Sequence, residues 1–201
     1  MAPRRDSVFV NCPFDPPFQP IFDAIVFAIL RCGFTPRCAL ETDDASENRF
    51  AKIQKIVEEC RYGIHDISRT ETNGEPPLPR FNMPLELGLF LGAKRYGDDV
   101  QKRKRILILD TERYRYQRFV SDLAGQDIHA HQNDPVEAIS AVTGWLRTQS
   151  RRAMPGGKRV ADEFARFQSE LPATLEALDL APDEATFIDF VSIASTHIDS
   201  L

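Results

Sequence analysis

The first 150 residues alternate between short apolar segments and amphipathic ones, and this alternation restricts the fold more than any other feature of the sequence. The apolar segments are typical of strands and span 7–11, 35–41, 62–68, 105–110 and 126–131. Apolar residues at helical spacing predict helices over 20–34, 42–60, 81–94, 112–125 and 134–150. A repeating strand–helix order predicts an α/β fold of the flavodoxin-like, doubly wound type, with about five parallel strands and helices on both faces of the sheet.

The sequence changes character after Ser150, where a basic linker with Gly and Pro, RRAMPGGKR, leads into a C-terminal extension. We therefore divide the chain into an α/β domain over 1–150 and a linker with two helices over 151–201. The helices are predicted at about 160–171 and 182–198, with aromatic residues spaced so that one face is buried. We expect that face to pack on the chain's own sheet domain rather than on a second copy.

The net charge of −5 argues against a protein that binds nucleic acid through its phosphates. The basic run KRKR at 102–105 precedes an apolar strand, and we interpret it as solvent-exposed. The sequence shows neither a signal peptide nor a segment long and apolar enough to span a membrane. These features predict a cytoplasmic protein that does not act at a membrane.

The cysteines and histidines do not have the spacing of a metal site, so we expect no bound metal. A cytoplasmic location further implies that the thiols are reduced. The cysteines are Cys12, Cys32, Cys38 and Cys60. We interpret Cys12 as a small buried residue and His65 as a core histidine. Tyr114 and Tyr116 are expected on the outer face of the helix predicted at 112–125.

Polar residues collect where the predicted strands end. In a parallel sheet of this type, ligands bind at the carboxyl ends of the strands, near the point where the strand order reverses. The candidates follow the first and third strands or begin the helix after the third strand, and are Asn11, Phe14, Asp15, Asp66, Ser68, Arg69, Arg80, Asn82 and Glu86. We predict that they share one site.

Glu86 stands out in the apolar stretch FNMPLELGLFLGAK. In one interpretation it only caps a helix: Met83 is the cap residue, Pro84 takes the first helical position, and Glu86 falls at the third, near free N–H groups. Capping does not explain Gly88 and Gly92, which destabilise a helix relative to alanine and often allow a close approach by another element or a ligand. In the other interpretation, Glu86 is held there for chemistry.

Five segments carry a recognisable pattern: VFVNCPFD, GFTPRCALE, RFAKIQKIVEECRYGIHDIS, MPLELGLFLGA and KRILILD. Together they resemble the superfamily that joins TIR domains with nucleoside 2-deoxyribosyltransferases, and the chain is similar to bacterial TIR-like proteins. The resemblance covers about 7–146. Its most specific part is the acid followed by Leu-Gly, with KRILIL after that helix. The chain departs from the deoxyribosyltransferases at Asn82-Met83, where they have Gly-Thr.

The resemblance implies an enzyme. Members of this superfamily break the N-glycosidic bond of a nucleoside or of NAD, so NAD or a related nucleotide is the expected substrate and no further cofactor is expected. Glu86 matches the family's catalytic glutamate, whose carboxylate stabilises or attacks the positively charged anomeric carbon. Asp66 is the second expected catalytic residue and would bind ribose hydroxyls.

The remaining candidates are expected to bind the substrate. The expected roles are base stacking by Phe14, hydrogen bonds to ribose or phosphate from Asn11, Ser68 and Asn82, and phosphate pairing by Arg69 and Arg80. Asp15 completes the set. An alternative stays open for Asn11 and Asp15, which can instead fix the turn around Pro13 by bonding to the backbone.

Other functions also stay open. TIR-like domains can act as scaffolds or nucleotide sensors without turnover, and a Glu86 that only caps a helix on a closed surface would favour that role. A deoxyribosyltransferase is a near variant of the main prediction. A phosphoacceptor receiver domain is disfavoured, because it needs an acid pair after the first strand and a lysine after the fifth. The resemblance further implies a homo-oligomer that completes the active site, and a role in antiphage defence.

Overall fold

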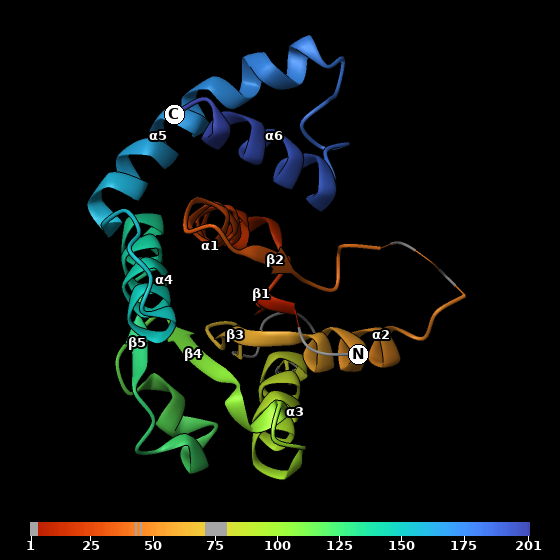
Figure 1. The fold of residues 1–201 in the computed structure, drawn as a ribbon, viewed down its shortest axis with the longest axis vertical. Coiled ribbons are helices and arrows are strands. Elements are labelled where there is room, and N and C mark those ends of the chain that lie inside the picture. Colours follow the sequence, from red (N-terminus) through yellow and green to blue (C-terminus); the bar gives the residue numbers. More distant parts are fainter. Residues whose placement is uncertain (1–3, 43, 45, 71–79) are drawn as a thin grey trace.

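One parallel sheet organises the chain (Figure 1). The structure is a computed structural model that describes residues 4–42, 44, 46–70 and 80–201. Within these residues five strands lie in the order β2-β1-β3-β4-β5, and all neighbouring pairs are parallel. The strands are β1 (Arg4–Asn11), β2 (Thr35–Arg37), β3 (Cys60–Asp66), β4 (Arg105–Asp110) and β5 (Ile128–Ala130). The predicted α/β fold with about five parallel strands is confirmed.

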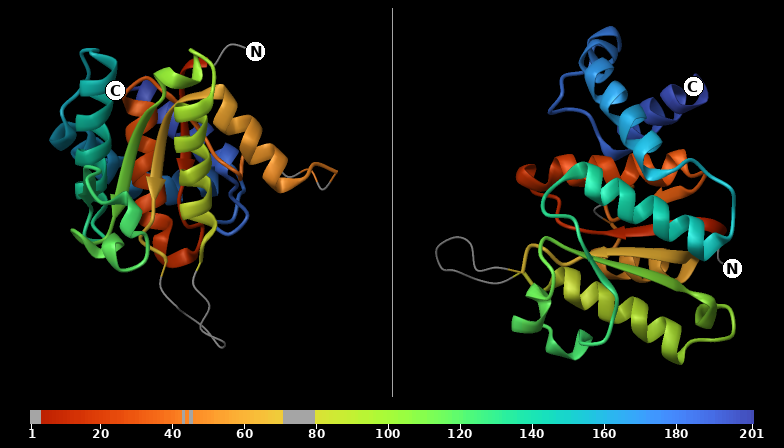
Figure 2. Two further views of the ribbon diagram at one scale, coloured as in Figure 1. Left: turned by 90° about the horizontal axis from the view of Figure 1, so that it is seen from below. Right: turned by 90° about the vertical axis from the view of Figure 1, so that its left-hand side faces the viewer.

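Helices cover both faces of the sheet (Figure 2), as the doubly wound prediction requires. One face carries α1 (Gln19–Arg31) and α4 (Pro135–Ser150), and the other carries α2 (Arg49–Glu59) and α3 (Asn82–Tyr96). Successive strand residues point to opposite faces. Val8 and Val10 of β1 therefore pack in the core under α1 and α4, whereas Phe9 between them packs in the core under α2 and α3.

The helices begin where the sequence supplies caps. The α4 start confirms the predicted one, because the Asp134 carboxylate accepts a hydrogen bond from the Val136 N–H at 2.8 Å and Pro135 takes the first position. In α2 the cap is Asn48, whose side chain accepts from the N–H groups of Phe50 and Ala51. The helix therefore starts at Arg49, later than the predicted start at residue 42.

The helix predicted at 112–125 was wrong. The segment contains two short 3₁₀ turns, η3 (Arg115–Arg118) and η4 (Ser121–Leu123). Tyr114 has a left-handed backbone conformation, with φ of 64°, which interrupts a helix. Arg115 is buried against Asp110, and Tyr116, expected to face outward, is only 4% exposed. Buried contacts of these two side chains therefore outweigh the helical spacing of the apolar residues.

The C-terminal extension packs on its own sheet domain, as expected. Its helices are α5 (Gly157–Ala177) and α6 (Phe187–Asp199), and both lie over α1 (Figures 1 and 2). The Phe27 ring of α1 lies 5.3 Å from the Phe164 ring and 5.2 Å from the Phe167 ring, centroid to centroid. Glu163 of α5 accepts two hydrogen bonds from Arg31, at 2.7 and 3.2 Å. Because α1 has the sheet on one side and the extension on the other, it is buried almost all around.

Candidate functional site

A pocket of about 420 Å³ opens where β1 ends and α3 begins. This is the point where the strand order reverses, since β2 lies on one side of β1 and β3 on the other. We call it the Glu86 pocket, and its lining residues are Asn11, Cys12, Pro13, Phe14, Asp15, Arg49, Arg80, Asn82, Met83 and Glu86. Six of the nine predicted site residues are therefore brought together here: Asn11, Phe14, Asp15, Arg80, Asn82 and Glu86.

Glu86 does not cap α3. The helix begins at Asn82, with Phe81 as its cap residue, so Glu86 is the fifth helical residue and not the third. Among the described residues its carboxylate has no hydrogen-bond or ion-pair partner. Burial raises the pKa of Glu86 from 4.5 to about 7, and the positive charge of Arg49 opposes this rise only in part. An unpaired, poorly solvated carboxylate in a pocket is typical of a functional group.

The raised pKa of Glu86 makes stability depend on pH, and the sign can be worked out. The folded protein holds the proton of the Glu86 carboxyl group more tightly than the unfolded chain does. The stability that this proton contributes is therefore fully present below pH 4.5 and is lost as the pH rises through about 7. Glu86→Gln cannot ionise. We expect the free energy of unfolding of the variant, relative to that of wild type, to increase on the order of 3 kcal/mol from about pH 4.5 to pH 8. Urea unfolding of both proteins at the two pH values measures this change. If the variant and wild type differed in stability by the same amount at both pH values, the prediction would be contradicted.

Asn11 ties three elements together. Its side-chain N–H₂ donates to the Met83 carbonyl of α3 at 2.9 Å and lies 3.0 Å from Nδ1 of His65 in β3. Met83 O can only accept, so the orientation of the Asn11 amide is fixed, and His65 must accept at Nδ1 and carry its proton on Nε2. Burial lowers the pKa of His65 to about 3, so its ring is neutral. Both amide hydrogens of Asn11 are therefore engaged in hydrogen bonds within the protein. Its side-chain carbonyl oxygen is the atom that can accept a hydrogen bond from a ligand in the pocket.

Removing this amide tests its structural role. Asn11→Leu keeps the approximate volume but leaves the Met83 carbonyl and His65 Nδ1 without their donor. We expect the free energy of unfolding to fall by about 2 kcal/mol. Asn82→Leu is the matched control, because Asn82 is exposed and should change stability by less than about 0.5 kcal/mol. Urea titration of both variants measures these changes. If Asn11→Leu were as stable as wild type, the structural role of the Asn11 amide would be excluded.

The two arginines predicted to bind phosphate are instead paired within the protein. Arg80 donates to Asp15 at 2.8 Å, and Arg69 lies 3.5 Å from the other oxygen of the same carboxylate. Asp15 therefore offsets their charge and draws the loops after β1 and β3 together. Arg69 does not reach the Glu86 pocket.

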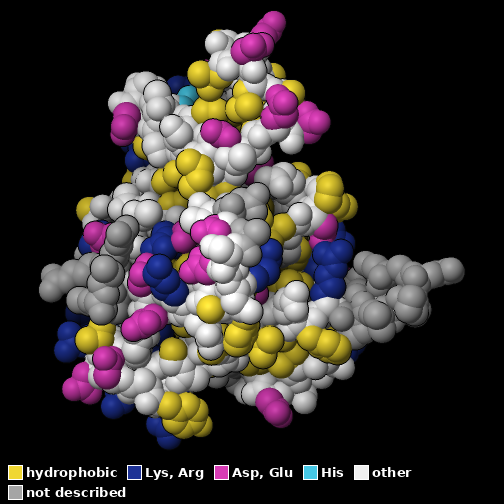
Figure 3. All heavy atoms as spheres, turned by 90° about the vertical axis from the view of Figure 1, so that its right-hand side faces the viewer, with side chains coloured by type: hydrophobic (Ala, Val, Ile, Leu, Met, Phe, Trp, Pro, Cys, Tyr) yellow, Lys and Arg dark blue, Asp and Glu magenta, His cyan; other side chains and the backbone are white. Residues whose placement is uncertain are grey.

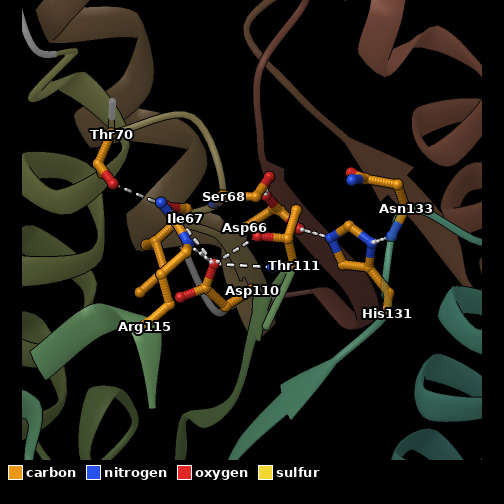
Figure 4. A network of polar contacts seen from close by, with 9 residues as sticks. All are labelled: Asp66, Ile67, Ser68, Thr70, Asp110, Thr111, Arg115, His131 and Asn133. Atoms are coloured by element: carbon orange, nitrogen blue, oxygen red, sulfur yellow. Dashed lines mark hydrogen bonds and ion pairs between the residues drawn. The ribbon is translucent and has the colours of Figure 1, made fainter. Parts of the chain in front are cut away.

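Asp66 and Ser68 also lie outside the Glu86 pocket, in a buried network at the ends of β3, β4 and β5 (Figure 4). Asp66 is fully buried. One of its oxygens accepts from the N–H and the hydroxyl of Ser68, and the other lies 3.0 Å from Nε2 of His131. The Asn133 N–H donates to His131 Nδ1 at 3.1 Å, so Nε2 carries the proton and donates it to Asp66. Both Asp66 oxygens are thus used within the protein, where they position the loops.

An ion pair beside Asp66 completes this network (Figure 4). Arg115 donates to Asp110 at 2.7 Å and to the Ile67 carbonyl at 2.8 Å, which joins the loops after β3 and β4. Burial raises the pKa of Asp110 despite the bonds from Arg115. Sequence reasoning missed this pair, and the only signal was the position of Asp110 at the end of the clearest apolar strand.

Two other hollows lie along the same edge of the sheet. One of about 360 Å³ holds Ser68 and Arg69, and one of about 860 Å³ lies against β5 and contains Tyr114 and His129. The second is larger than the Glu86 pocket, but none of the predicted site residues lines it. It also lies beside the edge strand, away from the reversal of strand order, so we do not take it as the primary site.

Arg49 and Cys12 were not predicted in the site. Arg49, the first residue of α2, lines the Glu86 pocket and has no acidic partner among the described residues. Its position relative to Glu86 depends on how two distant segments pack, which the sequence does not display. Cys12 is 3% exposed, and burial raises the pKa of its thiol well above the ordinary value, as suits an inert buried thiol.

Comparison with known proteins does not identify a family: no protein-family model matches the chain, and no curated protein matches it in sequence. Among the described residues, no helix has both the length and the apolar character needed to cross a membrane.

Proposed function

We propose that this protein cleaves the N-glycosidic bond of NAD or a related nucleotide, with Glu86 as the catalytic carboxylate. The observation that carries the proposal is that the Glu86 carboxylate has no partner among residues 4–42, 44, 46–70 and 80–201 and is poorly solvated, in a pocket at the reversal of strand order. The proposal includes membership of the TIR-like and deoxyribosyltransferase-like superfamily, which rests on the sequence segments quoted above.

The pocket supplies what bond cleavage needs. As the base departs, positive charge develops at the anomeric carbon, and an ionised Glu86 can stabilise that charge or attack the carbon to form an ester, which water then hydrolyses. Within the part of the chain that the structure describes, no hydrogen bond must be broken to free its carboxylate. Phe14 supplies an aromatic surface for a base, and the Asn11 carbonyl oxygen can accept from a ribose hydroxyl. Asp66 has a positioning role in this proposal, since its oxygens are already bonded.

Arg49 is the residue we assign to the substrate's phosphate, because Arg69 and Arg80 are paired with Asp15. Arg49→Gln is expected to raise KM for NAD about tenfold while changing kcat less, since phosphate binding is lost in ground and transition states alike. Lys55→Gln, which removes a charge from the exposed side of the same helix, should leave KM unchanged. Initial rates over a range of NAD concentrations measure both, and equal KM values would exclude the assignment.

Self-association is part of the proposal. Phe81 and Leu85 are 64% and 57% exposed near the pocket, and Tyr96 at the other end of α3 is 87% exposed. Figure 3 shows hydrophobic side chains gathered on the face that carries α2 and α3. Apart from the adjacent residues and the backbone of α3 itself, no described atom lies within 4 Å of the place a Cβ would take at Gly88 or Gly92, so no other part of the described chain packs there. A second copy packing here would account for the exposed apolar surface.

The proposal is tested by incubating the purified full chain with NAD and a panel of nucleosides, at several protein concentrations, and separating the products. Released nicotinamide supports the proposal, and a rate per molecule that rises with concentration supports self-association. Exchange of one base for another would identify a deoxyribosyltransferase. Saturable binding of NAD without release of a base would favour the non-catalytic sensing module.

A further inference from the structure

A separate hollow of about 640 Å³ lies between α1 and the two C-terminal helices, the region seen at the top of Figure 1. We call it the tail hollow. Its lining residues are mostly apolar and include four phenylalanines, Phe14, Phe22, Phe187 and Phe190, of which Phe22 and Phe187 are largely buried. The Phe22 ring lies 5.4 Å from the Phe14 ring and 5.9 Å from the Phe187 ring. Hollows of this size and character in proteins hold small organic ligands.

The charged side chains among the described lining residues of the tail hollow are all negative. Asp23 and Asp183 line it, and no Lys, Arg or His is among its described lining residues. The Asp23 carboxylate accepts from the Gln19 side chain at 2.7 Å and has no cationic partner among the described residues. Burial raises the pKa of Asp23 to about 6, and hydrogen bonds from Gln19 and Gln168 offset this only in part. A bound cation would stabilise this carboxylate, and a bound anion would be repelled.

We propose that the tail hollow binds an organic cation, an ammonium group on an aromatic or aliphatic body, with the ammonium group against Asp23. The body would bury apolar surface against the phenylalanine rings, which also attract a cation through their electron-rich faces. This site is distinct from the Glu86 pocket, and among the described lining residues the two share Phe14. The inference does not depend on any catalytic activity, because binding alone is at issue.

Three ligands with one indole body and different charges test the proposal: tryptamine, tryptophol and indole-3-acetate. Each is titrated into the full chain at about pH 8, where Asp23 is ionised, and binding is followed by calorimetry. We expect tryptamine to bind about tenfold more tightly than the neutral tryptophol, and indole-3-acetate to bind most weakly.

Two variants separate a specific site from general charge attraction. Asp23→Asn is expected to weaken tryptamine binding about tenfold while leaving tryptophol within about twofold of wild type. Asp162→Asn, which removes the same charge from an exposed position of α5, should change neither. The proposal is overturned if tryptamine shows no saturable binding, if it binds no better than tryptophol, or if both variants weaken it equally.

Discussion

Replacing Glu86 with glutamine is expected to slow the release of nicotinamide from NAD by about 10³-fold or more. Glutamine has nearly the same shape but cannot carry the negative charge that stabilises the forming oxocarbenium ion, and it cannot form the ester. Single-turnover measurements by chromatography follow the release directly. Because the charge is needed in the transition state, we expect the loss in kcat rather than in KM.

Loss of activity must be distinguished from loss of structure. The same substitution is expected to stabilise the fold above about pH 7, as argued above, so an inactive and more stable variant separates the two. Glu58→Gln, an exposed glutamate of α2, is the matched control and should retain full activity. If Glu86→Gln kept more than about a tenth of the wild-type rate, Glu86 would not be the catalytic carboxylate.

Ending the chain after Ser150 is expected to prevent stable folding. Removal of α5 and α6 would expose a row of large apolar side chains on α1, including Phe27, which is fully buried in the intact chain. Each such side chain contributes about 2 kcal/mol when buried, and a typical domain is stable by only about 5 to 15 kcal/mol. We expect the truncated chain to be insoluble or to lack a cooperative unfolding transition in urea.

Glu163→Gln is a milder test of the same interface. It weakens the ion pair with Arg31 but leaves the phenylalanine contacts in place, so it should cost about 1 to 3 kcal/mol and preserve cooperative unfolding. A soluble 1–150 fragment with a sharp transition would contradict the expectation for the truncation. It would instead support the division into domains at residue 150 that the sequence predicts.

The parts of the fold that could be predicted are those determined by local pattern. The buried strand β4 is a continuous apolar run, and α4 begins with Asp134 and Pro135, so both were visible in the sequence. The segment 112–125 also has helical spacing, but there Arg115 is buried and donates to the Ile67 carbonyl, 48 residues earlier in the chain, as well as to nearby Asp110. A pattern within a dozen residues does not contain that information.

The candidate site divides in the same way. The rule that ligands bind at the ends of parallel strands selected nine residues, and six of them line one pocket, because position along a strand is a local property. It did not predict that Asp66 would bond to His131, or that Asp15 would pair with Arg69 and Arg80. Those pairings depend on the relative directions of side chains in different loops.

Phe14 forms a wall of both the Glu86 pocket and the tail hollow. If a ligand in one hollow turns this ring, it changes the shape of the other hollow, and binding at the two places is then thermodynamically linked. Linkage is reciprocal: if a cation in the tail hollow changes the affinity for nucleotide by some factor, the nucleotide changes the affinity for the cation by the same factor. The affinity for the cation measured with and without nucleotide, and the affinity for the nucleotide measured with and without the cation, would therefore give the same coupling free energy.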